Sequence, residues 1–198
     1  MQPPSIDTEN VIGEMRAQGV IPAVRTSAQF ESAISLPKAP FVILLKGDLQ
    51  GMQRWIGRAR KSGKELLVHA DLIAGVGKDE SGMQFLSELG VFGILTTRSQ
   101  LLRSARKRGL FTIQRFFLID SEAFTSSVEQ AKKDQADMVE LLPGVLPSSI
   151  YRDFKEKVGL PFLCGGFVKT IQDTEELIEA GATGVTSSHS DLWQYHLG

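Results

Sequence analysis

Two pairs of small residues near the end of the chain have the composition of an anion-binding site. Gly165-Gly166 ends an apolar run and precedes a helix-like stretch, and Ser187-Ser188 ends the next apolar run. Glycine lets a backbone approach a ligand closely, and unpaired N–H groups at the start of a helix attract anions. We therefore expect these four residues to bind a phosphate group. The alternative is that the glycines only form a tight turn and the serines only cap a helix.

A histidine and a carboxylate form a second candidate pair. His69 and Asp71 are two residues apart in an apolar run, so they share a face if that run is a strand. They could hydrogen-bond the hydroxyls of a ligand, or Asp71 could orient His69 for proton transfer. They could also simply satisfy neighbouring loops. Since the chain has three histidines and no second cluster of ligands, we predict no metal site.

Further polar side chains end other apolar runs. Lys46 could contact a phosphate or form a Schiff base in an aldolase, whereas most lysines at such positions are only solvated. Gln114 and Arg115 are adjacent, so the alternation of side chains along a strand allows only one of them to point inward. Glu140 could contact a ligand or form an ion pair with Arg115 that braces neighbouring strands. Arg25, after the first run, is a further candidate.

Two clusters of basic residues lie outside these runs. One expected helix carries Arg103, Arg106, Lys107 and Arg108, and an earlier one carries Arg54, Arg58, Arg60 and Lys61. Basic clusters can bind a phosphate backbone, but a run of charge is usually a solvated helix face. No aromatic residues suited to base stacking are interleaved with these clusters. Because the net charge is −1, any contact with nucleic acid would have to be local.

Eight short apolar runs must position these side chains. They lie at 21–25, 41–46, 65–71, 92–97, 111–117, 138–143, 161–166 and 184–188, and a helix-like stretch follows each one. Alternating strands and helices imply a parallel sheet, and eight of them predict an α/β fold of the (β/α)8 TIM-barrel type. Functional groups in such barrels gather at the carboxyl ends of the strands. With 198 residues, we expect one compact domain over 1–198 with short loops, preceded at 1–19 by a helical extension.

The stretches between these runs carry helix signals. We expect helices over 27–36, 48–61, 79–89, 99–108, 121–134, from 147 onward, from 170 to before Gly181, and over 190–196. Ser27 and Ser121 are expected N-caps, and Thr170 with Asp173 has the spacing of a capping box.

Composition and the absence of recognisable signals indicate the cellular location of the protein. No apolar stretch approaches the ~18 residues needed to span a bilayer, and the N-terminus carries no targeting signal. The single cysteine, Cys164, has no partner for an internal disulfide, which is compatible with the cytoplasm. We expect a cytoplasmic protein with no membrane association.

Several blocks in a fixed order resemble the glycerol-3-phosphate-responsive antiterminator family, regulators of glycerol-uptake operons in bacteria. The blocks lie at 69–73 with Gly75, and at 112–121, 139–144, 165–166, 186–188 and 192–193. The similarity extends from Ile21 to Trp193. Two positions depart from the pattern: Phe167-Val168 stands where Leu-Ile is usual, and Lys46-Gly47-Asp48 replaces a glycine followed by an apolar residue.

The resemblance implies a small barrel that binds sn-glycerol 3-phosphate as an effector, without a cofactor. It would then act on the leader of nascent mRNA so that a terminator hairpin does not stop transcription. The phosphate would contact Gly165, Gly166, Ser187 and Ser188, which match the family's glycine and serine blocks. Lys46 would be an additional phosphate contact. The glycerol part would contact residues at the other strand ends: His69, Asp71, Gln114, Arg115 and Glu140. Ligand would favour a conformation or homo-oligomer that presents Arg103, Arg106, Lys107 and Arg108 to RNA.

Two other functions fit the same sequence. One is a lyase, epimerase or isomerase that acts on a small phosphorylated polyol through Lys46, His69, Asp71 or Glu140. The other is a sensor that contacts a protein partner in place of RNA. Turnover of the ligand would indicate the enzyme, and ligand-dependent RNA affinity would indicate the regulator.

Overall fold

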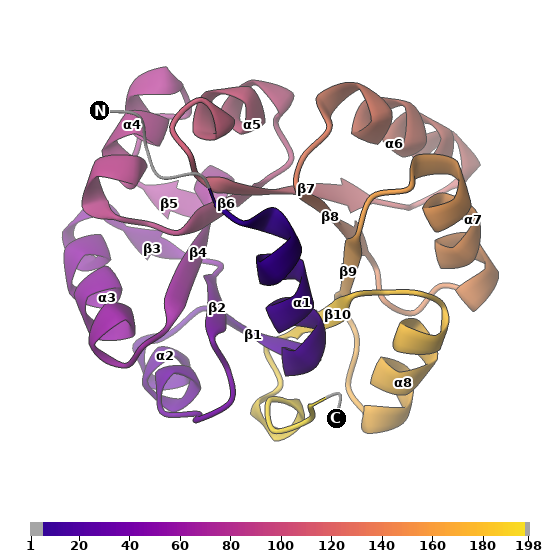
Figure 1. Ribbon diagram of the computed structural model, residues 1–198, viewed down its shortest axis with the longest axis horizontal. Coiled ribbons are helices and arrows are strands. Elements are labelled where there is room, and N and C mark those ends of the chain that lie inside the picture. Colours follow the sequence, from indigo (N-terminus) through magenta and orange to yellow (C-terminus); the bar gives the residue numbers. More distant parts are fainter. Residues whose placement is uncertain (1–5, 197–198) are drawn as a thin grey trace.

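Eight parallel strands close into a barrel in the computed structural model, which describes residues 6–196. The strands are β1 (Val20–Val24), β2 (Phe41–Leu44), β4 (Glu65–His69), β6 (Gly93–Thr96), β7 (Phe111–Phe117), β8 (Met138–Leu142), β9 (Phe162–Gly165) and β10 (Gly184–Ser187). Pairing of Val20 with Val185 joins the first strand to the last. The predicted (β/α)8 fold is therefore confirmed (Figure 1).

Helices surround the barrel on the outside, as Figure 1 shows. They are α2 (Ser27–Ile34), α3 (Leu49–Lys61), α4 (Glu80–Leu89), α5 (Ser99–Arg106), α6 (Ser121–Asp134), α7 (Ser148–Val158) and α8 (Ile171–Glu179). The capping box of α8 forms as predicted between Thr170 and Asp173. Two predicted caps were wrong by one residue, because Thr26 caps α2 and Asp120 caps α6 through their side chains.

The prediction of an α-helix over 190–196 was wrong. The chain there forms only a 3-10 turn, η2 (Ser190–Leu192). Trp193 ends it, with its side chain almost fully buried and its indole N–H donating to the Ser187 carbonyl at 2.8 Å. This contact ties the C-terminal segment to the end of β10.

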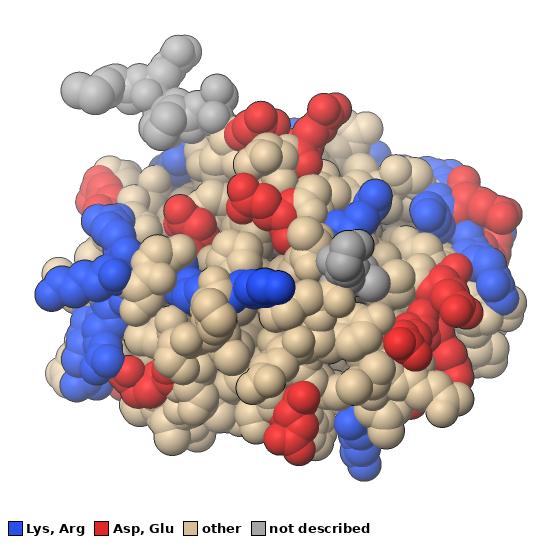
Figure 2. All heavy atoms as spheres, turned by 60° about the horizontal axis from the view of Figure 1, so that its bottom comes forward, with Lys and Arg blue, Asp and Glu red and all other residues tan. Residues whose placement is uncertain are grey.

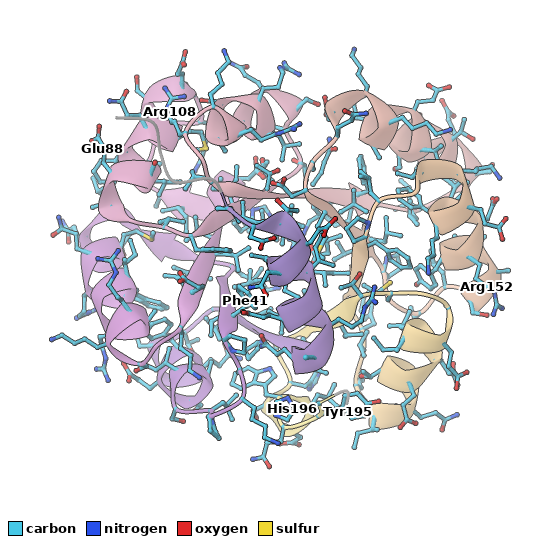
Figure 3. The ribbon with its side chains drawn as sticks, viewed as in Figure 1. Phe41, Glu88, Arg108, Arg152, Tyr195 and His196 are labelled. Carbon is cyan, nitrogen blue, oxygen red and sulfur yellow. The ribbon has the colours of Figure 1, made fainter. Side chains whose placement is uncertain are left out.

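The helix expected before the first strand covers the amino-terminal end of the barrel. It is α1 (Thr8–Gln18), and residues 1–5 of the expected extension lie outside the described residues, as do 197–198. Gln18 exchanges two hydrogen bonds with the backbone of Phe41, of 2.9 and 3.0 Å. Figure 3 labels Phe41 beside this helix. The carboxyl ends of the strands therefore face away from the viewer in Figure 1.

Side chains alternate between two apolar cores. The inward positions of the strands fill the barrel together with Met15 from α1 and include Ile43, Leu67, Ile113 and Leu163. The outward positions pack under the helices. Burying both faces is what a parallel sheet requires, and it explains why the strands are apolar throughout.

A second, smaller sheet lies at the carboxyl end of the barrel. Strand β3 (Gly47–Asp48) pairs with β5 (Ile73–Ala74), which follows a 3-10 turn, η1 (Ala70–Leu72). The sequence did not indicate this sheet, because two-residue strands carry no periodic signal. It links the segment that follows β2 to the segment that follows β4.

Candidate functional site

A cavity of about 120 Å³ opens at the carboxyl ends of the strands. The ends of β1, β7, β8, β9 and β10 supply most of its lining. It brings together five of the predicted ligand contacts: Arg115, Glu140, Gly166, Ser187 and Ser188. It also includes Arg25, Thr186 and His189, of which the sequence had indicated only Arg25 as a candidate.

An ion pair crosses the cavity floor between neighbouring strands. The Nε of Arg115 donates to Oε2 of Glu140 at 2.5 Å, and the Thr186 hydroxyl donates to Oε1 at 2.6 Å. Glu140 is fully buried, so these partners offset the cost of placing its charge in the interior. No described residue pairs with the Nη atoms of Arg115, which can therefore donate to a ligand.

Gly165 leaves room for this arrangement but does not line the cavity. A Cβ at this position would collide with Oγ1 of Thr186 and lie 3.2 Å from Oε1 of Glu140. Gly165, predicted to contact a phosphate, is therefore not in the cavity lining, and its missing side chain lets Thr186 reach Glu140.

The loop after β9 offers unpaired backbone donors. Gly166 and Phe167 both have left-handed backbone conformations, with φ of +78° and +64°. Phe167, Val168 and Ser188 line the cavity, and within residues 6–196 no acceptor is found for their N–H groups. Clustered backbone donors of this kind bind anions.

The start of α8 is already capped. The carboxylate of Asp173 accepts from the N–H groups of Lys169 and Thr170, each at 2.9 Å, and the Thr170 hydroxyl accepts from Asp173 N at 3.0 Å. An anion would therefore bind to the loop before the helix and not to the helix end that the sequence suggested.

His69 lies beside this cavity, buried and facing inward, but not in its lining. Burial, followed by the nearby Arg115 charge, lowers the pKa of His69 to about 4, so its ring is neutral at pH 7. Its Nδ1 lies 3.5 Å from Oδ2 of Asp71 and has no hydrogen-bond partner among residues 6–196.

Asp71 serves the loop between β6 and α5. Its Oδ2 accepts from Thr97 N at 3.0 Å, and its Oδ1 lies 3.0 Å from Nε of Arg98, an ion pair without the alignment of a hydrogen bond. The Asp71 carboxylate is thus directed away from the cavity. This agrees with the alternative interpretation of the sequence, in which Asp71 hydrogen-bonds a neighbouring loop.

Two other predicted contacts lie outside the cavity. Strand alternation points Arg115 inward and Gln114 toward α6, where its amide donates to Oδ2 of Asp134 at 2.7 Å. Burial alone would raise the pKa of Asp134, but hydrogen bonds from Ser99, Gln130 and Gln114 hold it below its ordinary value. Lys46 is exposed and follows Leu45, which is the residue of this segment that lines the cavity.

The basic cluster on and after α5 is largely engaged within the protein. The Nη1 of Arg106 donates to the carbonyls of Asp134 and Gln135 at 3.2 and 2.6 Å, and Arg103 pairs with Asp134 at 3.6 Å. Arg108 donates to Ser104 and pairs with Glu80 of α4 at 3.0 Å. Among the described residues, only Lys107 of these four has no partner. This cluster therefore connects α5 to its neighbouring helices.

The fold and the cavity define a (β/α)8 barrel with a cationic site at the carboxyl ends of its strands. The chain belongs to the glycerol-3-phosphate responsive antiterminator family, whose sequence model matches residues 20–193. This membership supports a regulatory role in glycerol uptake.

Individual relatives agree with the family. One relative is a glycerol uptake operon antiterminator regulatory protein from Listeria monocytogenes, which has a crystal structure and is 29% identical in sequence. The two structures have a TM-score of 0.85, and the match covers 99% of this chain and 100% of that one. A glycerol uptake operon antiterminator-related protein from Thermotoga maritima is 26% identical with a TM-score of 0.80, over 90% of this chain and 99% of that one. Escherichia coli (strain K12) YgcP, described as uncharacterised, is 29% identical over 90% of this chain and 93% of its own.

More distant barrels show only a shared fold. At 11% to 14% identity they include aldolases, a lyase and an epimerase.

Between residues 6 and 196, no helix is both long and apolar enough to cross a membrane. Over the same residues, no group of three or more histidine, cysteine, aspartate or glutamate side chains is placed to hold a metal ion.

Proposed function

We propose that this barrel binds sn-glycerol 3-phosphate in the cavity and then binds the leader of nascent mRNA, promoting antitermination of glycerol-utilisation genes. Family membership supports the regulatory part. The observation that carries the ligand part is the meeting of unpaired backbone donors after β9 with the Arg115–Glu140 pair in one small cavity. The phosphate of a phosphorylated polyol suits the backbone donors, and its hydroxyl groups suit the Arg115–Glu140 pair.

The cavity suggests which end of the ligand goes where. The phosphate would accept from the N–H groups of Phe167, Val168 and Ser188 and pair with Arg25, whose guanidinium has no ion-pair partner among the described residues. The glycerol hydroxyls would lie toward Glu140, which accepts hydrogen bonds, and the Nη atoms of Arg115, which donate them. Neutral His69, beside Arg115, could serve the same hydroxyls.

Binding of the effector would change the population of the RNA-binding state. It can do so only if the ligand binds that state, a conformation or a homo-oligomer, more tightly than the other. Such action on nascent transcripts would take place in the cytoplasm. The effector is its ligand, and the proposal requires no cofactor.

The alternative that the protein is an enzyme with a covalent mechanism has no support in the cavity. No lysine is among the residues that line the cavity, so a Schiff-base aldolase mechanism through Lys46 has no support. Both carboxylate oxygens of Glu140 are occupied by Arg115 and Thr186, which suits a binding residue better than a mobile proton donor.

Calorimetric titration tests the ligand part. We expect sn-glycerol 3-phosphate to bind, inorganic phosphate to bind more weakly, and glycerol not to bind at the same concentrations. Product analysis after long incubation should show the ligand unchanged. A folded protein that does not bind the ligand, or that converts it, would contradict the proposal.

A further inference from the structure

A groove between α2 and α3 is larger than the ligand cavity. It consists of two adjoining hollows of about 380 and 190 Å³ that share Ser27, Arg54 and Trp55. Gln50 and Asp48 line the larger hollow, and Phe30 and Arg58 line the smaller one. The ligand site does not use this groove.

Trp55 provides an aromatic surface in both hollows. It is half-buried, and its indole packs against Phe30 with ring centroids 4.7 Å apart, so this neighbour fixes its position. Aromatic side chains that are held in place and partly exposed are stacking platforms for unpaired bases. The expectation that no aromatic residue is interleaved with the basic cluster of α3 was wrong, because Trp55 follows Arg54 and precedes Arg58 in the sequence. The fold adds that all three side chains line the same hollow.

The groove is lined by two acidic and two basic side chains, Glu31, Asp48, Arg54 and Arg58, and it lies beside a basic helix. Helix α3 carries four basic residues and no acidic one. Arg58 pairs with Glu31 of α2, and the Asp48 carboxylate accepts from Gly51 N at 2.7 Å but keeps its charge, so Arg54 is the cation of the groove that is left for a phosphate. No ion pair or hydrogen bond joins the Arg54 side chain to another described residue. Figure 2 shows basic side chains gathered at its left edge, the side on which α3 lies, while both signs of charge are mixed elsewhere on that face.

The groove also borders the ligand site through a short segment. Leu45 lines the ligand cavity, and two residues later Gly47 lines the groove. Gly47 belongs to β3, which pairs with β5 a few residues beyond His69. A ligand that displaces the end of β2 would thus act directly on one wall of the groove.

We propose that this groove is the RNA-binding site and that it takes single-stranded RNA. An unpaired base stacks on Trp55, and the adjoining phosphate pairs with Arg54. This inference rests on the proposed function, because it locates the RNA contact that function requires. It places that contact on α3, where Arg54 is unpaired, and not on α5, where three of the four cations are engaged within the protein.

The fluorescence of Trp55 provides a direct test. The chain has two tryptophans, and Trp193 is 1% exposed, so a stacking base would quench only Trp55. The probe is a random-sequence pool of single-stranded RNA, added at low salt with saturating glycerol 3-phosphate. We expect quenching in the wild-type protein and none in Trp55→Phe, which retains Trp193 as the background.

Filter binding of the same pool adds an independent measurement. We expect Trp55→Leu to bind about tenfold more weakly, the loss of one stacked base. Arg54→Gln should also bind more weakly and show a smaller dependence on salt, because one phosphate contact is lost. Arg152→Gln is the matched control: it removes the same charge from α7, on the opposite side of the barrel from α3 (Figure 3), and should bind as the wild type does.

The outcomes separate this inference from the function on which it rests. If the wild type binds RNA without quenching and Arg54→Gln matches Arg152→Gln, the groove is not the site, although RNA binding stands. If the wild type binds no RNA with the ligand present, both are contradicted. Calorimetry then shows separately whether the ligand part survives.

Discussion

Arg115 and Glu140 are joined across adjacent strands at the floor of the cavity, with the arginine Nε 2.5 Å from the carboxylate Oε2. Register pairs these two residues directly, and strand alternation points both inward. The pair therefore does two things: it neutralises a buried carboxylate, and it leaves the Nη atoms of Arg115 free to meet a ligand. The sequence had left open whether it was structural or ligand-binding, and the geometry allows both.

Removing one member of this pair should destabilise the fold. Glu140→Ala leaves the Arg115 charge without its partner in the interior, so we expect a loss of about 3 kcal/mol in the free energy of unfolding, measured with urea. Glu31→Ala breaks the exposed pair with Arg58 and should cost about 1 kcal/mol or less. Equal losses in the two variants would contradict the stabilising role given to the buried pair.

Gly165 should tolerate no side chain. Gly165→Ala places a methyl group against Thr186 and near Glu140, so we expect weaker glycerol 3-phosphate binding and a lower melting temperature. Gly13→Ala is the control, since its new methyl group meets nothing within 4 Å in the middle of α1. That change should raise stability by about 1 kcal/mol. A Gly165→Ala protein that binds the ligand normally would show that the position is not constrained as described.

His69 should make stability depend on pH. Its pKa is about 4 in the folded protein, below the ordinary value of 6.5, so between these values the unfolded chain binds the additional proton. Stability is therefore lost as the pH falls from 6.5 toward 4. His69→Gln should remove this part of the loss, as measured by urea unfolding across that range. Parallel curves for the variant and the wild type would mean that His69 is not held neutral by burial.

Arg25 and Lys46 should differ in their effect on ligand binding. Arg25 lines the cavity and Lys46 does not. We expect Arg25→Gln to weaken glycerol 3-phosphate binding at least about tenfold, the loss of a charge-assisted hydrogen bond, and Lys46→Gln to change it little. Calorimetry on both variants decides this. The opposite order would restore Lys46 as the phosphate contact that the sequence suggested.

The barrel could be predicted because it depends on periodic, local signals. Apolar runs and capping residues such as Thr170 and Asp173 lie within a few positions of one another. The site was harder, because the direction of a side chain depends on residues far away in sequence. Asp71 turns toward Thr97 and Arg98, and Gln114 turns toward Asp134. The adjacency of Gln114 and Arg115 did predict that only one would point inward, but not which.

The groove could not be predicted for a similar reason. The ring of Trp55 becomes a platform only because Phe30 of α2 packs against it, 25 positions earlier in the chain. Likewise, Arg106 and Arg108 looked available until folding brought carbonyl groups and Glu80 to them. Counting charges along a helix cannot show which of them are already paired.

Ligand bound in the barrel should control the binding of RNA. The most direct measurement is the affinity of the wild-type protein for the random-sequence single-stranded RNA pool, with and without sn-glycerol 3-phosphate. We predict that the ligand strengthens binding by about tenfold or more, a coupling of at least about 1.4 kcal/mol, and that Arg25→Gln reduces this gain at the same ligand concentration. RNA affinity that is identical with and without saturating ligand would contradict the account.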